Sequence, residues 1–279
     1  MIGSFLSVFG FCWENNADAS SHTPDVMLTE STAPALIFSS TTPKTPPKKN
    51  AYRQLCQQLQ DLSYTEEEVK RLLLPLEQPH SFTATEAWFN DSLVNDYFQQ
   101  LATQYPNLEV ISSLMTQCET SLPDRLRTWS KYREWKMRLS QSSLVFWPIH
   151  QADHWHLIVI DNRSREANVY MLDGFNTKNK DILTGYGFEL ASVIRSELPT
   201  EHMSGEFISV AAQKNIYDCG SVICFYAKLI AEFYSKHRQL PELSVLNTSN
   251  VDYTDFRKNI AETLRDFGAS VKSVSRSRL

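Results

Sequence analysis

The chain has 279 residues, of which 42% are hydrophobic and 11% aromatic, enough for one sizeable buried core. Its net charge of −5 leaves no basic excess to neutralise phosphates, so we expect no nucleic-acid partner. Five scattered cysteines without a Cys-x-x-Cys pair favour a reducing compartment. The apolar start lacks the basic region and cleavage site of a Sec signal peptide, and no stretch is apolar for long enough to span a bilayer.

The composition predicts a flexible leader, one domain and a short tail. Residues 1–49 are mostly rich in Ser, Thr and Pro, which bury too little apolar surface to offset the entropy lost on ordering. We expect one domain over 50–268, with 50–80 as a helical arm facing the substrate and 81–268 as the catalytic core. Residues 269–279 are predicted to be a basic, frayed tail.

Two helices are predicted in the arm. Apolar residues recur at helical spacing from Tyr52 to Leu62. Thr65 and Glu68 then form a capping box, which predicts the start of the second helix. Pro75, with a further proline four residues on, is expected to close that helix.

A third helix is predicted after Trp88, with Asn90 or Asp91 as its N-cap. Taken alone, Trp88 is more typical of a core residue than of an exposed platform. Residues 122–139 are predicted to form an amphipathic helix with a basic face, which either is solvated or meets an acidic partner.

Three strands are predicted next, over 144–149, 154–160 and 167–172. If the polar loop between the last two closes a hairpin at residues 160 and 167, His154 pairs with Asp173 across the ladder. Opposed Cβ atoms lie about 4.5–5.5 Å apart, which lets an imidazole reach a carboxylate. An error of one residue in this register would separate the two groups.

The rest of the chain predicts a helix over 181–198, a strand over 206–210 and a last helix over 252–267. Cys219 opens an apolar helix that we expect to be buried at the centre of the molecule. The predicted fold class is therefore α+β, a mixed sheet with packed helices in a single domain and a cysteine at the N-terminus of the central helix.

Cys219 has the features of a nucleophile. A helix N-terminus stabilises a thiolate, and a histidine partner lowers the thiol pKa further. His154 is the candidate base, Asp173 the group that orients it, and Gln213 a side-chain donor for an oxyanion. A buried structural cysteine is the simpler interpretation of Cys219 when it is considered without these partners.

Rival residues exist for these roles. His150 and His156 lie near His154, Asp161 is a rival acid at the other end of the hairpin, and Cys224 lies inside the apolar helix. The spacing of His150 and His154 could indicate zinc, but we expect no cysteine or acidic cluster to join them. We therefore predict no metal and no cofactor.

Four segments together resemble the ubiquitin-like-protein cysteine proteases of the ULP/SENP type. They cover roughly residues 80–235 and occur in that family's order: Trp88-Phe-Asn-Asp91, His154-Trp155, Tyr170-Met-Leu-Asp173 and Gln213-x5-Cys219-Gly220. Each segment alone is weak, whereas the four in order with this Gln-to-Cys spacing are specific. The resemblance implies the papain-type fold of that family.

The resemblance also implies a role for seven residues. Cys219 is the expected nucleophile, His154 the base, Asp173 its orienting acid and Gln213 part of the oxyanion hole, while Trp88 and Trp155 clamp the terminal Gly-Gly of the substrate and Asp91 contacts an arginine of the modifier. Two indoles that clamp a chain leave room only for residues without side chains. The narrow tunnel between the two indoles would therefore select a substrate that ends in Gly-Gly.

The predicted function is a thiol isopeptidase that removes ubiquitin, or a ubiquitin-like modifier such as SUMO or NEDD8, from lysines. We expect a monomer. Phe89 and Ile216-Tyr217 depart from the pattern of eukaryotic members, which suggests a bacterial effector secreted into the host cell cytoplasm. The alternatives are a Cys-dependent acetyltransferase of the same fold that uses acetyl-CoA, and a pseudoenzyme that only binds a modifier. Asp173, Trp155 and the Gln-to-Cys spacing favour the protease.

Overall fold

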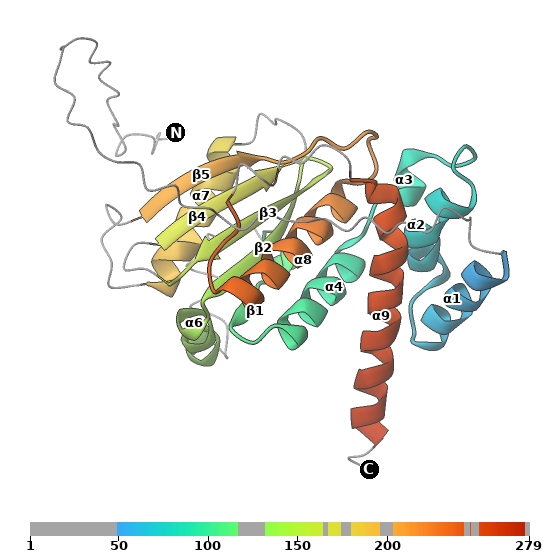
Figure 1. The fold of residues 1–279 in the computed structure, drawn as a ribbon, viewed down its shortest axis with the longest axis horizontal. Helices are drawn as coiled ribbons and strands as arrows, with labels where there is room; N and C mark the ends of the chain where they lie inside the picture. The colour runs from blue at the N-terminus through green and yellow to red at the C-terminus, as the bar shows by residue number, and fades with distance from the viewer. Residues whose placement is uncertain are drawn as a thin grey trace, which may run out of the picture. The chain divides into compact units, whose positions relative to one another are not determined.

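The computed structural model describes residues 49–116, 132–163, 167–173, 180–195, 203–242, 246 and 251–276. All but the last residue of the predicted leader, and residues 122–131 of the predicted basic helix, lie outside the described residues. The described chain has the predicted α+β class, with a mixed sheet and packed helices (Figure 1). Within these ranges, no helix combines the length and the apolar character needed to cross a membrane.

The sheet has five strands in the order β1-β2-β3-β4-β5. They are β1 (Leu108–Val110), β2 (Leu144–Gln151), β3 (His154–Asp161), β4 (Ala167–Asp173) and β5 (Met203–Ser209). The three central strands are antiparallel, and the two edge strands run parallel to their neighbours. The three central strands confirm those predicted over 144–149, 154–160 and 167–172, and β5 begins three residues earlier than predicted.

Helices cover both faces of the sheet (Figure 1). One face carries α4 (Asp91–Gln104) and α8 (Cys219–His237). α9 (Tyr253–Arg276) packs on these two helices, and α1 (Lys49–Asp61) and α2 (Glu66–Glu77) pack against α9. The other face carries α6 (Tyr132–Gln141) and α7 (Lys180–Ile194). Two further helical segments are short: α3 (Ala84–Ala87) precedes α4, and η1 (Ser113–Thr116) follows β1. Successive side chains of β3 point to opposite faces, so Leu157 packs on the α8 side and Ile158 on the α7 side.

The arm over 50–80 is part of the main core. Leu59 and Leu72 are fully buried in the cluster that contains α8 and α9. Thr65 and Glu68 form the predicted capping box at the start of α2. Whether this arm also faces a substrate stays a prediction.

The register of β3 and β4 differs from the prediction by two residues. The ladder pairs Leu157 with Leu172 and Ile160 with Val169, so the next position opposite Asp173 is His156, not His154. The expected opposition of His154 and Asp173 was therefore wrong. Because the shift is even, both residues keep the same face of the sheet, and His154 reaches Asp173 diagonally.

The sequence predicted that Pro75 ends α2. In the structure, Pro75 instead lies inside the last turn of this helix. Proline has no N–H to bond the carbonyl four residues earlier, which here belongs to Arg71. That carbonyl instead accepts a hydrogen bond from Nη1 of Arg257 at 2.5 Å. A donor from α9 thus satisfies the group that the proline leaves open, and the helix continues to Glu77.

The last helix is longer than predicted. It continues past Phe267 to Arg276, so most of the expected frayed tail is helical. The predicted helix over 181–198 ends at Ile194, and residues 196–198 lie outside the described residues.

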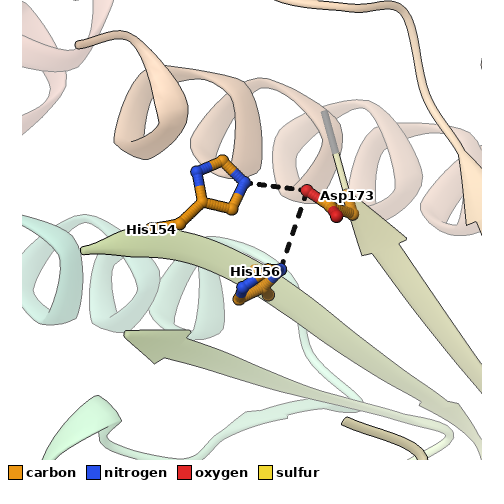
Figure 2. Close-up of side chains that lie close together, drawn as sticks. All are labelled: His154, His156 and Asp173. Carbon is orange, nitrogen blue, oxygen red and sulfur yellow. Dashed lines mark hydrogen bonds and ion pairs between the residues drawn. The ribbon is translucent and has the colours of Figure 1, made fainter. Parts of the chain in front are cut away.

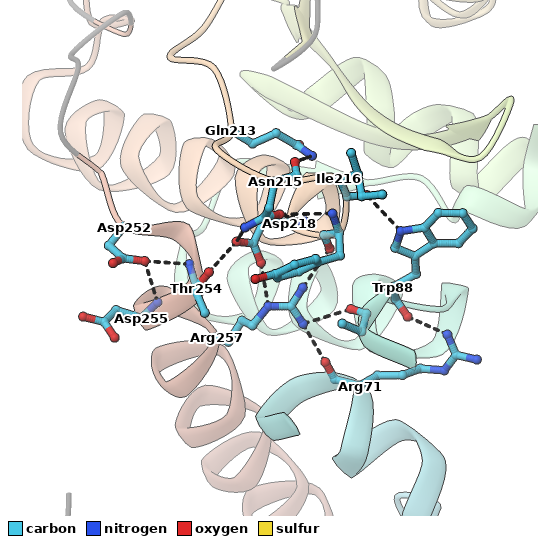
Figure 3. Close-up of polar contacts among 12 residues, drawn as sticks. Arg71, Trp88, Gln213, Asn215, Ile216, Asp218, Asp252, Thr254, Asp255 and Arg257 are labelled. Atoms are coloured by element: carbon cyan, nitrogen blue, oxygen red, sulfur yellow. Dashed lines mark hydrogen bonds and ion pairs between the residues drawn. The ribbon is translucent and has the colours of Figure 1, made fainter. Parts of the chain in front are cut away.

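Arg257 of α9 is fully buried and holds together the segments around the start of α8 (Figure 3). Its Nε donates to Oδ1 of Asp218 at 2.7 Å. Its two Nη atoms donate to the main-chain carbonyls of Arg71, Ala87 and Tyr217. Burial lowers the pKa of Arg257, and the neighbouring Asp218 carboxylate offsets part of that effect.

Asp218 receives three side-chain donors. Besides Arg257, Nδ2 of Asn215 and Oγ1 of Thr254 each donate to its Oδ2 at 2.6 Å. Asp218 is the N-cap residue of α8, yet its side chain makes no capping bond. Its carboxylate fixes the loop before α8 to α9.

We predict that the pair of Asp218 and Arg257 stabilises the fold strongly as a unit. Arg257→Met or Asp218→Asn alone should each lower the free energy of unfolding by about 3–5 kcal/mol, because one buried charge is left unpaired. In urea titrations, the double variant should lose clearly less than the sum of the two single losses.

Arg265→Met is the matched control on the same helix. Arg265 forms a solvent-exposed pair with Asp266, so its loss should change the free energy of unfolding by less than about 1 kcal/mol. Strict additivity of Arg257→Met and Asp218→Asn would contradict the coupling.

Candidate active site

Cys219 is the first residue of α8, as the sequence predicted, and its side chain is buried. The loop before it is shaped by Asn215, whose Oδ1 accepts from the amides of Tyr217 at 3.0 Å and Asp218 at 2.9 Å. The first turn of a helix leaves amide N–H groups unpaired and carries partial positive charge. The thiol therefore lies where an anion is stabilised.

Position 220 must be a glycine for Cys219 to lie at the start of α8. A Cβ atom at position 220 would lie 2.7 Å from the ring of Phe89, far inside van der Waals contact. Phe89 in turn lies 4.6 Å under the guanidinium of Arg257. The start of α8 is thus packed directly against the segment that carries Trp88.

His154, at the start of β3, bonds to Asp173, at the end of β4, through Nε2 and Oδ1 at 2.8 Å (Figure 2). Burial lowers the pKa of His154, but hydrogen bonds and charge from Asp173 and Cys219 outweigh it and raise the pKa to about 9. At neutral pH the ring is an imidazolium between a carboxylate and the sulfur of Cys219. Since Nε2 is used by Asp173, Nδ1 is the nitrogen left for Cys219.

The rival residues take other places. His156 is buried, and burial lowers its pKa to about 4. The His150 ring packs against Trp155 at 4.8 Å between centroids, and Asp161 binds Nε of Arg163 at 2.7 Å. Cys224 is fully buried, and burial raises its pKa well above the ordinary value. Of the histidines in the described ranges, His154 is the one that is hydrogen-bonded to Asp173 and interacts electrostatically with Cys219.

The ligand atoms of His154, His156 and Asp173 lie within 4.8 Å of one another. The prediction already placed Asp173 beside His154, and the shifted register brings Asp173 close to His156 as well. A metal ion on all three residues would have to replace the 2.8 Å hydrogen bond of His154 and Asp173. The geometry is that of a hydrogen-bonded acid–base pair.

Gln213 lies in the loop that precedes Cys219 and is buried. Its Nε2 donates to the carbonyl of Asn215 at 2.5 Å, which uses one of the two N–H bonds of the amide (Figure 3). The second N–H remains for another acceptor. Its role at an oxyanion stays a prediction.

The two tryptophans differ in exposure. Trp155 is only 2% exposed and donates from Nε1 to the carbonyl of Phe89 at 3.0 Å, so it supports that segment from the core. Trp88 is half-buried and donates from Nε1 to the carbonyl of Ile216 at 2.9 Å, which ties it to the loop before Cys219 (Figure 3). The preference for a core position was thus misplaced for Trp88.

Asp91 is the first residue of α4, and Asn90 is its N-cap, with Oδ1 accepting from the amide of Leu93. Oδ1 of Asp91 accepts from Oγ of Ser113 at 2.5 Å. A contact of Asp91 with an arginine of a modifier stays a prediction.

Comparison with known proteins identifies the same family as the site geometry. The protein-family model described as "Ulp1 protease family, C-terminal catalytic domain" matches residues 87–267 of the sequence. The chain is 27% identical to the ubiquitin-like-specific protease ESD4 of Arabidopsis thaliana, over 54% of this chain and 33% of that protein. It is also 27% identical to human sentrin-specific protease 2, over 52% of this chain and 26% of that protein. The chain thus spans a third or less of these two relatives.

Solved structures agree on the fold. The Ulp1 protease domain in complex with Smt3, the yeast ortholog of SUMO, superposes with a TM-score of 0.58 at 17% identity, over 81% of this chain and 98% of that one. Ulp1 with an oxidised catalytic cysteine gives the same TM-score of 0.58 at 16% identity, over 80% and 97%. Since the family model covers well over half of the sequence, the chain belongs to the Ulp1 family of cysteine proteases.

Proposed function

We propose that this chain is a thiol isopeptidase that cuts after the C-terminal Gly-Gly of a SUMO-type modifier. The observation that carries the proposal is the chain of contacts from Asp173 through His154 to Cys219 at the N-terminus of α8. The names of the relatives, a ubiquitin-like-specific and a sentrin-specific protease, support a ubiquitin-like modifier as the substrate class. The Ulp1 domain bound to Smt3 supports SUMO in particular.

The proposed reaction has two steps. Cys219 thiolate attacks the carbonyl carbon of the terminal glycine, and the imidazolium of His154 gives its proton to the departing lysine amine, which leaves a thioester on the sulfur. Neutral His154 then takes a proton from the water that attacks the thioester. The C–S bond breaks, the glycine leaves with a carboxyl group, and the proton stays on His154, which restores the thiolate–imidazolium pair. Asp173 holds the ring in place throughout.

Two further groups act on the substrate in this proposal. The second N–H of Gln213 and the amides at the start of α8 donate to the oxyanion formed in each step. Trp88, held at the carbonyl of Ile216, covers the glycines before the scissile bond. Trp155 supports this wall from the core through its bond to Phe89.

Ubiquitin is the second candidate modifier, because Asp91 would suit an arginine that more than one modifier carries. The idea of a bacterial effector in a host cell is based on Phe89 and Ile216-Tyr217 alone and stays a prediction. Both are compatible with the same chemistry at Cys219.

The first test is labelling with SUMO, ubiquitin and NEDD8 that carry a thiol-reactive C-terminus. We expect a covalent adduct with SUMO that Cys219→Ala abolishes. Cys224→Ala is the matched control, since Cys224 is fully buried in the same helix and should label like the wild type. An adduct with ubiquitin alone would replace SUMO as the substrate, and a folded protein without any adduct would contradict the isopeptidase.

The second test is the pH dependence of kcat/KM. Because the proton donor is the imidazolium of His154, activity should fall at alkaline pH with an apparent pKa of about 9. Asp173→Asn removes the charge that raises this pKa, so the alkaline limb should move to lower pH. An alkaline limb that Asp173→Asn leaves unmoved would contradict the assignment.

The same pKa predicts a pH-dependent stability. The folded-state pKa of His154 lies above the ordinary 6.5, so its contribution to the free energy of unfolding is fully present below pH 6.5 and is lost as the pH rises through about 9. The free energies of unfolding of wild type and His154→Gln, measured by urea titration, should therefore differ most near pH 6.5 and least above about pH 9. A difference that is constant from pH 6.5 to 9.5 would contradict the shift.

A further inference from the structure

His156 lies beside the proposed catalytic pair but has no part in the reaction as described. Its side chain is 1% exposed. The ring stands edge-on to that of His154, with 4.6 Å between centroids and an interplanar angle of 80°. Figure 2 shows both rings directed at the carboxylate of Asp173 from neighbouring positions of β3.

Both ring nitrogens of His156 are buried, and neither has a hydrogen-bond partner within the part of the chain that the structure describes. A neutral imidazole carries one N–H donor and one acceptor, and burying a donor without an acceptor is unfavourable. Nδ1 of His156 lies 3.7 Å from Oδ1 of Asp173, slightly beyond hydrogen-bond distance. This is the same oxygen that accepts from Nε2 of His154.

The charge state of His156 suits a donor to that oxygen. Burial lowers the pKa of His156, and the nearby His154 and His150 act in the same direction. The charge of Asp173 and the main chain of Gln151 act in the opposite direction and raise it, which leaves the pKa at about 4. The ring is therefore neutral at the pH where His154 is an imidazolium. A neutral N–H dipole can orient the carboxylate without competing with His154 as a second cation.

We propose that His156 is a positioning residue, which as the Nδ1–H tautomer donates to Oδ1 of Asp173 and holds this carboxylate towards His154. A movement of about half an ångström closes the present 3.7 Å to hydrogen-bond distance. Asp173 is the last residue of β4, and its main-chain carbonyl accepts from the amide of Val210 at 3.4 Å. The added donor would restrict the side chain at this strand end. The effect on turnover rests on the proposed function, whereas the tautomer does not.

The first experiment is nitrogen-15 NMR of the histidine rings in the wild-type protein between pH 6 and 8. The proposal expects His156 to be neutral in this range, with its proton on Nδ1. A proton on Nε2, or a charged ring, would overturn it. No substrate is involved, so this result is independent of whether the chain cuts SUMO.

The second experiment compares His156→Leu with His156→Asn. Asparagine keeps an N–H donor at the position of Nδ1, whereas leucine keeps bulk without a donor. We expect His156→Leu to lower kcat roughly tenfold through misplacement of the base, with KM changed less than about twofold, and His156→Asn to recover most of the loss. Rates are taken per active site titrated with the thiol-reactive modifier, which removes any effect of the folded fraction.

Ile149→Val is the control for packing alone, because Ile149 pairs with His156 in the ladder of β2 and β3. It should lower the melting temperature and leave kcat unchanged. Equal kcat for the leucine and asparagine variants, or wild-type kcat in His156→Leu, would overturn the proposal. If His156→Leu does not fold, His156→Gln replaces it in the comparison. The N–H donor of glutamine lies farther along the side chain than that of asparagine, so it should not reach Asp173 in the same way. A kcat of His156→Gln equal to that of His156→Asn would overturn the proposal.

Discussion

A fully buried guanidinium is tolerated only when its N–H groups meet acceptors, and this requirement organises the region behind the active site. The acceptors of Arg257 are the carboxylate of Asp218 and carbonyls of Arg71, Ala87 and Tyr217. These groups belong to three segments: α2, the end of α3 and the loop before Cys219. None of them can move away from α9 without leaving a buried N–H unsatisfied. The residue before Trp88 and the residue before Cys219 therefore share one anchor.

Pro75 shows how a local defect becomes part of this anchor. In isolation, a proline removes a helical hydrogen bond and favours a helix end. Here the carbonyl that it leaves open is the acceptor of Arg257, and α2 continues because a partner from α9 satisfies that group. Local propensity predicts the helix end correctly only when no such partner exists. The partner lies 186 residues away in the sequence, beyond the range of any helical pattern.

Features set by neighbouring residues could be predicted from the sequence. The capping box of Thr65, the runs of strand-forming residues in the central strands and the helix that begins at Cys219 all depend on contiguous residues, and the structure shows each of them. Arg257 could not be matched with Asp218, because the two are separated by 39 positions in the sequence and no period or motif pairs them. The contact of His156 with Asp173 was missed for a related reason: the length of the polar loop left the register uncertain by two residues.

That register also decides the electrostatics of the site. One carboxylate oxygen faces two imidazoles, 2.8 Å from Nε2 of His154 and 3.7 Å from Nδ1 of His156. If both rings were charged, they would repel each other, and Asp173 could neutralise only one of them. The side chain of His154 is 11% exposed and that of His156 only 1%, and their pKa values are driven apart, to about 9 and about 4.

In the proposed reaction, two similar groups with opposite protonation states divide the work: His154 carries the proton and His156 is a fixed dipole. The positive charge thus remains on the ring that contacts Cys219, where a thiolate at a helix N-terminus can use it. The deeper ring adds an N–H without adding charge. The division depends on the even register shift, since an odd shift would place Asp173 on the other face of the sheet, away from both rings.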